Sequence, residues 1–196
     1  FYFKKEQNIN KAIHYLTLAA DKNHSDAQYS LGLIYTQPIL CGQNINKAIH
    51  YLTLASNQNN PKAQEILGLT YYLGHYIHRD IEKSIYYYKL AADNNNSDAQ
   101  LALGQIYIHG EFVEKDIRKS IYYYTLAANQ NVLQALFELG LVYYNNKIES
   151  FEKDNQNAIH YFTLAADQNY ADAQYILAYI YAEGKKVDQN MPKAIH

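Results

Sequence analysis

The sequence predicts an all-α solenoid of about five helix–turn–helix repeats, each close to 36 residues long. One block, KAIHYLTLAA from Lys11, returns in variant form from residues 47, 83, 119 and 157, and KAIH ends the chain. A second block, DAQYSLGLIY from Asp26, returns from residues 62, 98, 133 and 172. Self-similarity at a fixed period is the signature of repeat architectures, in which each unit buries its apolar face against its neighbours.

Both blocks have the period of an α-helix. In the second block, Ala27, Leu31, Ile34 and Tyr35 follow the spacing i, i+4, i+7, i+8, which places them on one helical face. In the first block, Ile13, Leu16, Thr17 and Ala20 follow the spacing i, i+3, i+4, i+7. Each repeat is therefore expected to contain two amphipathic helices.

Polar residues mark the expected helix boundaries. A side chain that can cap a helix N-terminus precedes each first block, at Asn8, Asn44, Asp80, Asp116, Asp154 and Asn190. Asparagine, which tolerates the left-handed conformation at a helix C-terminus, follows each first block, at Asn23, Asn59, Asn95, Asn131 and Asn169. These signals predict a leading helix over 8–22, helix pairs over 24–58, 60–94, 96–130 and 132–168, a trailing helix over 170–184 and a partial helix over 190–196.

A glycine recurs inside the second block of four repeats, at Gly32, Gly68, Gly104 and Gly140. Glycine inside a helix costs about 1 kcal/mol relative to alanine, so its recurrence indicates a close approach to a neighbouring helix. We expect the opposing surface to consist of the small residues Ala19, Ala55, Ala91, Ala127 and Ala165.

The pattern A-x-x-x-L-G-x-x-Y, followed by a loop that often contains glycine and valine and then by D-x-x-K-A-x-x-Y-x-x-x-A-A, resembles the Sel-1-like repeat family. The best copy is AQLALGQIYIHGEFVEKDIRKSIYYYTLAA, residues 99–128, and the resemblance covers essentially all 196 residues. It implies a right-handed α-α superhelix in which the first helix of each pair, the one that carries the glycine, lines the concave side. It also implies a role as an adaptor that binds other proteins.

Composition excludes several other classes of protein. The net charge is −2 and the basic residues are dispersed, so no nucleic-acid-binding surface is expected. No apolar run approaches the roughly 18 residues of a membrane span, and direct membrane insertion is not expected. The single cysteine, Cys41, cannot form a disulfide within the chain. Both ends of the chain fall inside a repeat, as in a fragment of a longer protein; its compartment is unknown, with the cytoplasm favoured.

Within the glycine-bearing block, positions away from the packed stripe vary between repeats. We expect these positions to face solvent and to form the surface that binds a partner protein or peptide, although they could instead pack against the next repeat. They are Tyr29, Leu33, Glu65, Leu69, Tyr72, Leu101, Gln105, Ile108, Phe137, Leu141, Tyr144, Tyr175 and Tyr179.

No motif predicts catalysis, a cofactor or a metal site. The recurring His14, His50 and His160 alternate with tyrosine in other repeats, which is unsuitable for a metal ladder. His75 and His78 on one predicted loop, with a third histidine one repeat later, could hold zinc only weakly. The alternatives to a scaffold are a regulatory arm of a larger signalling enzyme, such as a kinase, and a hydrolase of the family's cysteine-rich branch, whose paired cysteines are missing here.

Overall fold

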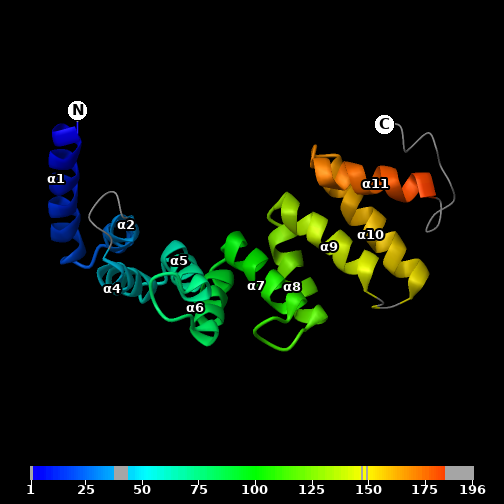
Figure 1. The fold of residues 1–196 in the computed structure, drawn as a ribbon, viewed down its shortest axis with the longest axis horizontal. Helices are drawn as coiled ribbons and strands as arrows, with labels where there is room; N and C mark the ends of the chain where they lie inside the picture. Colours follow the sequence, from blue (N-terminus) through cyan, green and yellow to red (C-terminus); the bar gives the residue numbers. More distant parts are fainter. Residues whose placement is uncertain (1, 38–43, 147, 149, 184–196) are drawn as a thin grey trace. The chain divides into compact units, whose positions relative to one another are not determined.

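The structure, a computed structural model, describes residues 2–37, 44–146, 148 and 150–183, and its regular elements there are all α-helices. The glycine-bearing block forms helices that we call the A helices, and the other block forms the B helices (Figure 1). The A helices are α2 (Ser25–Thr36), α5 (Pro61–Leu73), α7 (Ser97–His109), α9 (Leu133–Asn145) and α11 (Ala171–Glu183). The B helices are α1 (Tyr2–Ala20), α4 (Ile45–Ser56), α6 (Ile81–Asp93), α8 (Ile117–Ala128) and α10 (Phe151–Ala166).

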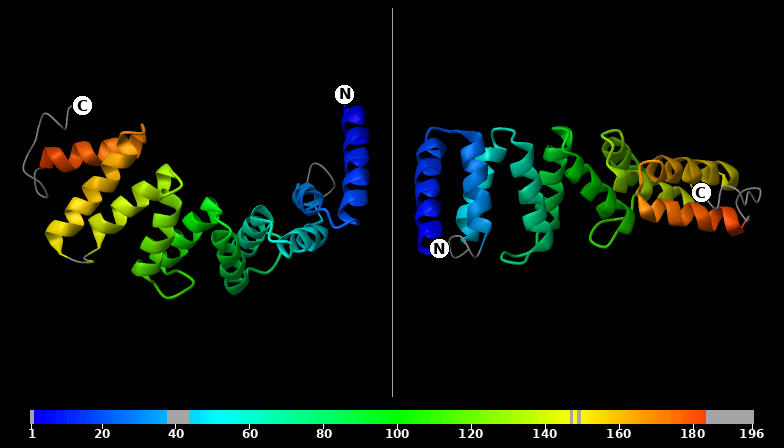
Figure 2. Two further views of the ribbon diagram at one scale, coloured as in Figure 1. Left: turned by 180° about the vertical axis from the view of Figure 1, so that it is seen from behind. Right: turned by 90° about the horizontal axis from the view of Figure 1, so that it is seen from above.

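The chain divides into two compact units, residues 1–100 and 101–196, with the boundary inside α7. Within each unit, A and B helices alternate, and each packs beside the helix that precedes it in the chain (Figures 1 and 2). The predicted architecture of helix–turn–helix repeats is confirmed. The predicted helix over 190–196 and the residues Cys41 and Asn190 lie outside the described residues.

Three of the predicted N-caps are confirmed. The side chains of Asn44, Asp80 and Asp116 accept hydrogen bonds from the backbone N–H three residues later, at 2.9–3.0 Å. Asp80 and Asp116 also pair with the lysine ammonium of that same residue at 2.9 Å. Each cap satisfies an N–H group that has no partner within the helix.

Two other predicted caps are wrong. Asn8 lies inside α1, which begins at Tyr2, because the segment before it contains no glycine or proline and several strong helix formers. Asp154 lies inside α10, which begins one turn earlier with Ser150 as its N-cap. Asp154 follows Asp116 by 38 residues instead of 36, because this repeat contains two extra residues. Asp154 is 3% exposed and accepts a hydrogen bond from the Ile148 backbone N–H at 2.9 Å, so the insertion gives it a different backbone partner.

The predicted asparagine turns are confirmed. The five asparagines that follow the B helices have φ between 59° and 64°, the left-handed region that asparagine tolerates better than other non-glycine residues. Gly74 adopts the same conformation at the C-terminus of α5, and Gly110 has φ 65° just after α7. Asn146, which replaces this glycine after α9, is extended instead, with φ −119°.

Each helical glycine contacts the B helix that follows it, as predicted, but the opposing side chain is large. A Cβ on Gly68 would lie 2.7 Å from the ring of Tyr88, and one on Gly140 would lie 2.4 Å from the ring of Phe162. Leu52 and Tyr124 occupy the same position opposite Gly32 and Gly104. The expected alanine surface is therefore wrong as the partner of the glycines, because the missing Cβ makes room for a ring or a leucine. The alanines Ala55, Ala91, Ala127 and Ala165 are nevertheless fully buried.

A second contact, which we call the glutamine latch, joins consecutive repeats at the start of an A helix. Gln64 is fully buried and donates to the carbonyl of Ser56 at 3.2 Å, while its own carbonyl accepts from Asn94 at 3.0 Å. Gln28 does the same with the carbonyl of Ala20, at 3.2 Å, and with Gln58, at 2.6 Å. Each buried amide thus connects the end of one B helix, an A helix and the turn after the next B helix.

Candidate functional site: a groove between the A helices α2 and α5

The tyrosines of the repeat motif mainly hold A and B helices together. Tyr71 of α5 stacks on Tyr87 of α6 with centroids 5.8 Å apart and rings 4° from parallel. The Lys83 ammonium lies 5.2 Å above the Tyr71 ring, a favourable cation–π geometry. Equivalent stacks occur at Tyr35–Tyr51, Tyr107–Tyr123 and Tyr143–Tyr161. These rings are committed to the packing of each pair.

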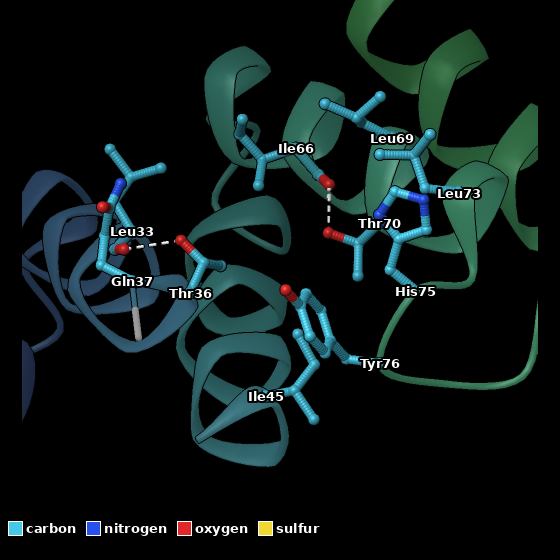
Figure 3. A pocket seen from close by; sticks show the side chains of 10 residues that line it. All are labelled: Leu33, Thr36, Gln37, Ile45, Ile66, Leu69, Thr70, Leu73, His75 and Tyr76. Carbon is cyan, nitrogen blue, oxygen red and sulfur yellow. Dashed lines mark hydrogen bonds between the residues drawn. The ribbon is translucent and has the colours of Figure 1, made fainter. Parts of the chain in front are cut away.

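A cavity of about 290 Å³ opens between α2 and α5 in the first unit (Figure 3). Leu33 of α2 and Leu69 of α5, both predicted binding residues, line it. Thr36, which belongs to the same variable set of positions as Tyr29 and Leu33, also lines it. The rest of its lining was not predicted from the sequence as binding surface and comprises Gln37, Ile45, Ile66, Thr70, Leu73, His75 and Tyr76. Sequence repetition selected positions within the A helices, whereas this cavity also uses the loop after α5 and the start of α4.

The lining of the cavity is mainly apolar, with five leucine and isoleucine side chains and one tyrosine. Thr36 and Thr70 donate their hydroxyls to carbonyls of their own helices at 2.7 Å, as Figure 3 shows. Leu69 and Leu73 are each 37% exposed, and Tyr76 is 60% exposed. Large apolar side chains open to solvent at a cavity are a common feature of interaction sites.

An acidic region lies one helical turn from the cavity. Glu65 precedes Leu69 by four residues on α5, so the two side chains share a face. The pKa of Glu65 is raised by partial burial and, to a smaller extent, by the negative charge of Asp98. Tyr29 of α2 lies close enough to feel the Glu65 charge, which, after burial, raises the pKa of its phenol. The apolar cavity therefore has a partly buried carboxylate one helical turn away on the same face of α5.

Several predicted binding residues are not free surface. The ring centroid of Phe137 lies 5.7 Å from that of Phe162 and 5.4 Å from that of Tyr170. Leu141 and Tyr144 pack into the same cluster. Leu101 and Ile108 pack against the cluster around Tyr124, and Tyr29 packs against the cluster around Leu52. The expectation that these positions face solvent is wrong, because each A helix also touches a neighbouring repeat.

The other predicted residues differ in exposure. Tyr72 and Gln105 are half-buried, whereas Tyr175 is 73% exposed and Tyr179 is 47% exposed. Neither exposed tyrosine lines a cavity described here. The groove between α2 and α5 is therefore the best-defined part of the predicted surface.

A second cavity, of about 300 Å³, lies in the second unit on the side of the B helices α8 and α10. Leu136 and Gln168 line it. Leu136 stands where Gln28 and Gln64 form latches, and Gln168 turns back to the Leu164 carbonyl of its own helix at 3.3 Å. The sequence carried this signal as a leucine in place of the repeated glutamine, but the spacing alone did not indicate a cavity.

The recurring histidines lie at the surface. His14, His50 and His160 are exposed, and each presents an edge to the tyrosine that follows it, with centroids 5.2–5.3 Å apart. Among the described residues, no group of three or more histidine, cysteine, aspartate or glutamate side chains is placed to hold a metal ion. None of the helices in that part of the chain is both long and apolar enough to cross a membrane.

Comparison with known structures identifies similar folds. The chain is 28% identical to a Sel1 repeat protein from Oxalobacter formigenes, with a TM-score of 0.76 over 95% of this chain and 76% of that protein. It is 26% identical to c5321, a protective antigen of uropathogenic Escherichia coli strains with an SLR fold, with a TM-score of 0.79. That match covers 93% of this chain but only 38% of the antigen.

A third structure, Helicobacter pylori cysteine rich protein B, is 26% identical, with a TM-score of 0.53 over 66% of this chain and 93% of that protein. No curated protein sequence matches the chain. The Sel1 repeat profile matches residues 4–24, 25–60, 61–96, 97–132, 133–170 and 171–196, and the chain therefore belongs to the Sel1 repeat family.

Proposed function

We propose that this chain is a protein-interaction scaffold, without catalytic activity of its own, and that the groove between α2 and α5 binds a segment of a partner protein. The observation that carries the proposal is the mainly apolar cavity with two partly exposed leucines, Leu69 and Leu73, at its edge. Sel1 repeats typically mediate protein interactions, which supports the same function.

The physical basis of binding is the removal of apolar surface from water. Full burial of one leucine side chain contributes about 1.5–3 kcal/mol. Leu69 and Leu73 are already partly covered, so an apolar side chain in the cavity would gain a part of that contribution from each. The hydroxyls of Thr36 and Thr70 are bonded within their helices, so an apolar ligand would leave neither hydroxyl without a hydrogen bond.

The proposal is tested by affinity capture from an extract of the source organism, with the partners identified by mass spectrometry. The double variant Leu69→Ser/Leu73→Ser should lose the captured partners while melting near the wild-type temperature. The matched control is Tyr86→Ser/Tyr122→Ser, which alters two tyrosines of the B helices that are each 58% exposed. Loss of partners in the control but not in the leucine variant would place binding on the B helices and contradict the proposal.

A further inference from the structure

We propose that the groove between α2 and α5 selects a positively charged peptide, in which one lysine or arginine lies beside Glu65 and one bulky apolar side chain enters the adjoining cavity. This inference rests on the proposed function of the same groove, and it names the chemistry of the partner. It joins two features that lie on the same face of α5, the cavity beside Leu69 and the Glu65 carboxylate one turn earlier.

The geometry places the two features in line. Glu65, Leu69 and Leu73 are spaced i, i+4, i+8 on α5, so they form one stripe along the helix. On α2, Leu33 lines the cavity, and Tyr29, one turn earlier and packed against the cluster around Leu52, lies close enough to Glu65 to feel its charge. At 1.5 Å per residue, Glu65 lies about 6 Å along the axis from Leu69 and about 12 Å from Leu73.

The Glu65 carboxylate has no hydrogen-bond or ion-pair partner within the described part of the chain. Its charged neighbour across the repeat boundary is Asp98 at the start of α7, which has the same sign. Lys62, three residues earlier on α5, is exposed and forms no ion pair with Glu65 among the described residues. Glu65 and Asp98 therefore carry charges of the same sign that act on each other, and neither forms an ion pair within the part of the chain that the structure describes.

Charge complementarity decides which occupant fits. A partly buried carboxylate next to a second carboxylate is destabilised in its charged form, and a cation placed between them removes that cost. An acidic segment in the same groove would meet two like charges, which disfavours it. The cavity adjoins this region and accepts an apolar side chain. An extended peptide rises about 3.3 Å per residue, so the basic and apolar residues should be about two to four positions apart.

The test uses random 12-residue peptides displayed on phage and selected on the immobilised chain. The expected result is enrichment of sequences with lysine or arginine two to four residues from leucine, isoleucine, methionine or phenylalanine. An enriched peptide is then synthesised with a fluorescent label, and its affinity is measured by anisotropy. The double variant Glu65→Gln/Asp98→Asn, which keeps the side-chain shapes, should weaken its binding by about tenfold, and added salt should weaken binding to the wild type.

The control Glu82→Gln/Asp93→Asn also removes one glutamate and one aspartate charge, but from exposed positions on α6. It should bind the peptide as the wild type does. Equal loss in both charge variants would mean general attraction and would overturn the inference.

The selection could instead enrich peptides without basic residues. If these bind Leu69→Ser/Leu73→Ser poorly but bind Glu65→Gln/Asp98→Asn as well as the wild type, the inference is overturned and the proposed function stands. If no peptide is enriched, or if the enriched peptides bind both groove variants as tightly as the wild type, the inference and the proposed function are both overturned. Melting curves for every variant establish that the fold is retained.

Discussion

The repeats over 25–60 and 61–96 carry a buried glutamine at the latch position of their A helix, whereas the repeat over 133–170 carries a leucine there. In the first two, Gln28 and Gln64 are buried latches with a backbone acceptor and a side-chain donor. In the later repeat, Leu136 takes that position, and Phe137 and Tyr170 build an aromatic cluster around Phe162. The α9 N-cap is Val132, which makes no side-chain cap bond, whereas Asn60 caps α5.

The difference shows that one joint can be built in two ways on the same glycine contact. A satisfied buried amide fixes the register of its neighbours, because any shift would leave its donors and acceptors unpaired. An apolar joint gains more from burial but tolerates sliding, and here it leaves the cavity beside Leu136. The following predictions test this contrast in order of decreasing effect.

The glycine contact should be essential in both kinds of repeat. Gly68→Leu and Gly140→Leu each force a side chain into the ring of Tyr88 or Phe162. Each variant should lose at least about 3 kcal/mol of unfolding free energy, measured by urea denaturation. Similar losses are expected in the two repeats, and a tolerated Gly140→Leu would show that the apolar repeat can separate its helices.

Exchanging the two joints should reveal their asymmetry. Gln64→Leu removes the hydrogen bonds to Ser56 and from Asn94 and should cost about 1–2 kcal/mol. Leu136→Gln should cost less than about 1 kcal/mol, since Gln168 stands where Gln58 does and can complete a latch. Urea denaturation of both variants, with Leu136→Gln/Gln168→Ala as the control, decides the point. A Leu136→Gln cost larger than that of Gln64→Leu would contradict the idea that the repeat can accept either joint.

The ring that faces glycine differs by one hydroxyl between repeats. The Tyr124 hydroxyl lies near the Ser120 hydroxyl, yet both atoms are buried and neither has the geometry of a hydrogen bond. Tyr124→Phe should therefore leave the melting temperature unchanged or raise it, because it removes an unpaired buried group. Phe162→Tyr should lower stability by about 1 kcal/mol. A large loss in Tyr124→Phe would show that its hydroxyl is bonded in solution.

The smallest effect concerns the half-buried carboxylates Glu65 and Glu138. Burial raises the pKa of both, but Asp98 raises that of Glu65 further, whereas the charge of His109 opposes the rise at Glu138. In the window between the ordinary glutamate pKa near 4.5 and the raised folded value, the folded state binds more protons than the unfolded state, so unfolding free energy falls as pH rises. Glu65→Gln should therefore stabilise the chain at pH 7, by less than about 1 kcal/mol.

At pH 3.5 the Glu65→Gln difference should vanish, because the glutamate is then protonated in both states. Glu138→Gln should show a smaller change between the two pH values. Thermal melts at pH 3.5 and 7 measure both variants. Equal stabilisation of Glu65→Gln at the two pH values would rule out ionisation as its cause.

The sequence alone determined the features that depend on neighbouring residues. The 36-residue period is visible as repetition in the sequence itself. The caps at Asn44, Asp80 and Asp116 and the left-handed asparagines follow from local backbone chemistry, which a few consecutive side chains decide. The need for a close helix contact at Gly68 and its equivalents was readable for the same reason, since glycine inside a helix has few other uses.

Only the tertiary structure decided which side chain enters each glycine contact, which A-helix residues remain open and where the cavities lie. Ala91 and Tyr88 are equally plausible partners of Gly68 by spacing, and the crossing of α5 with α6 selects Tyr88. Phe137 and Leu69 occupy similar faces of their helices. Phe137 is covered by the aromatic cluster around Phe162, whereas Leu69, in its own repeat, remains at the edge of the cavity. Burial depends on what packs from a distant part of the chain, and a single repeat's residues do not carry that information.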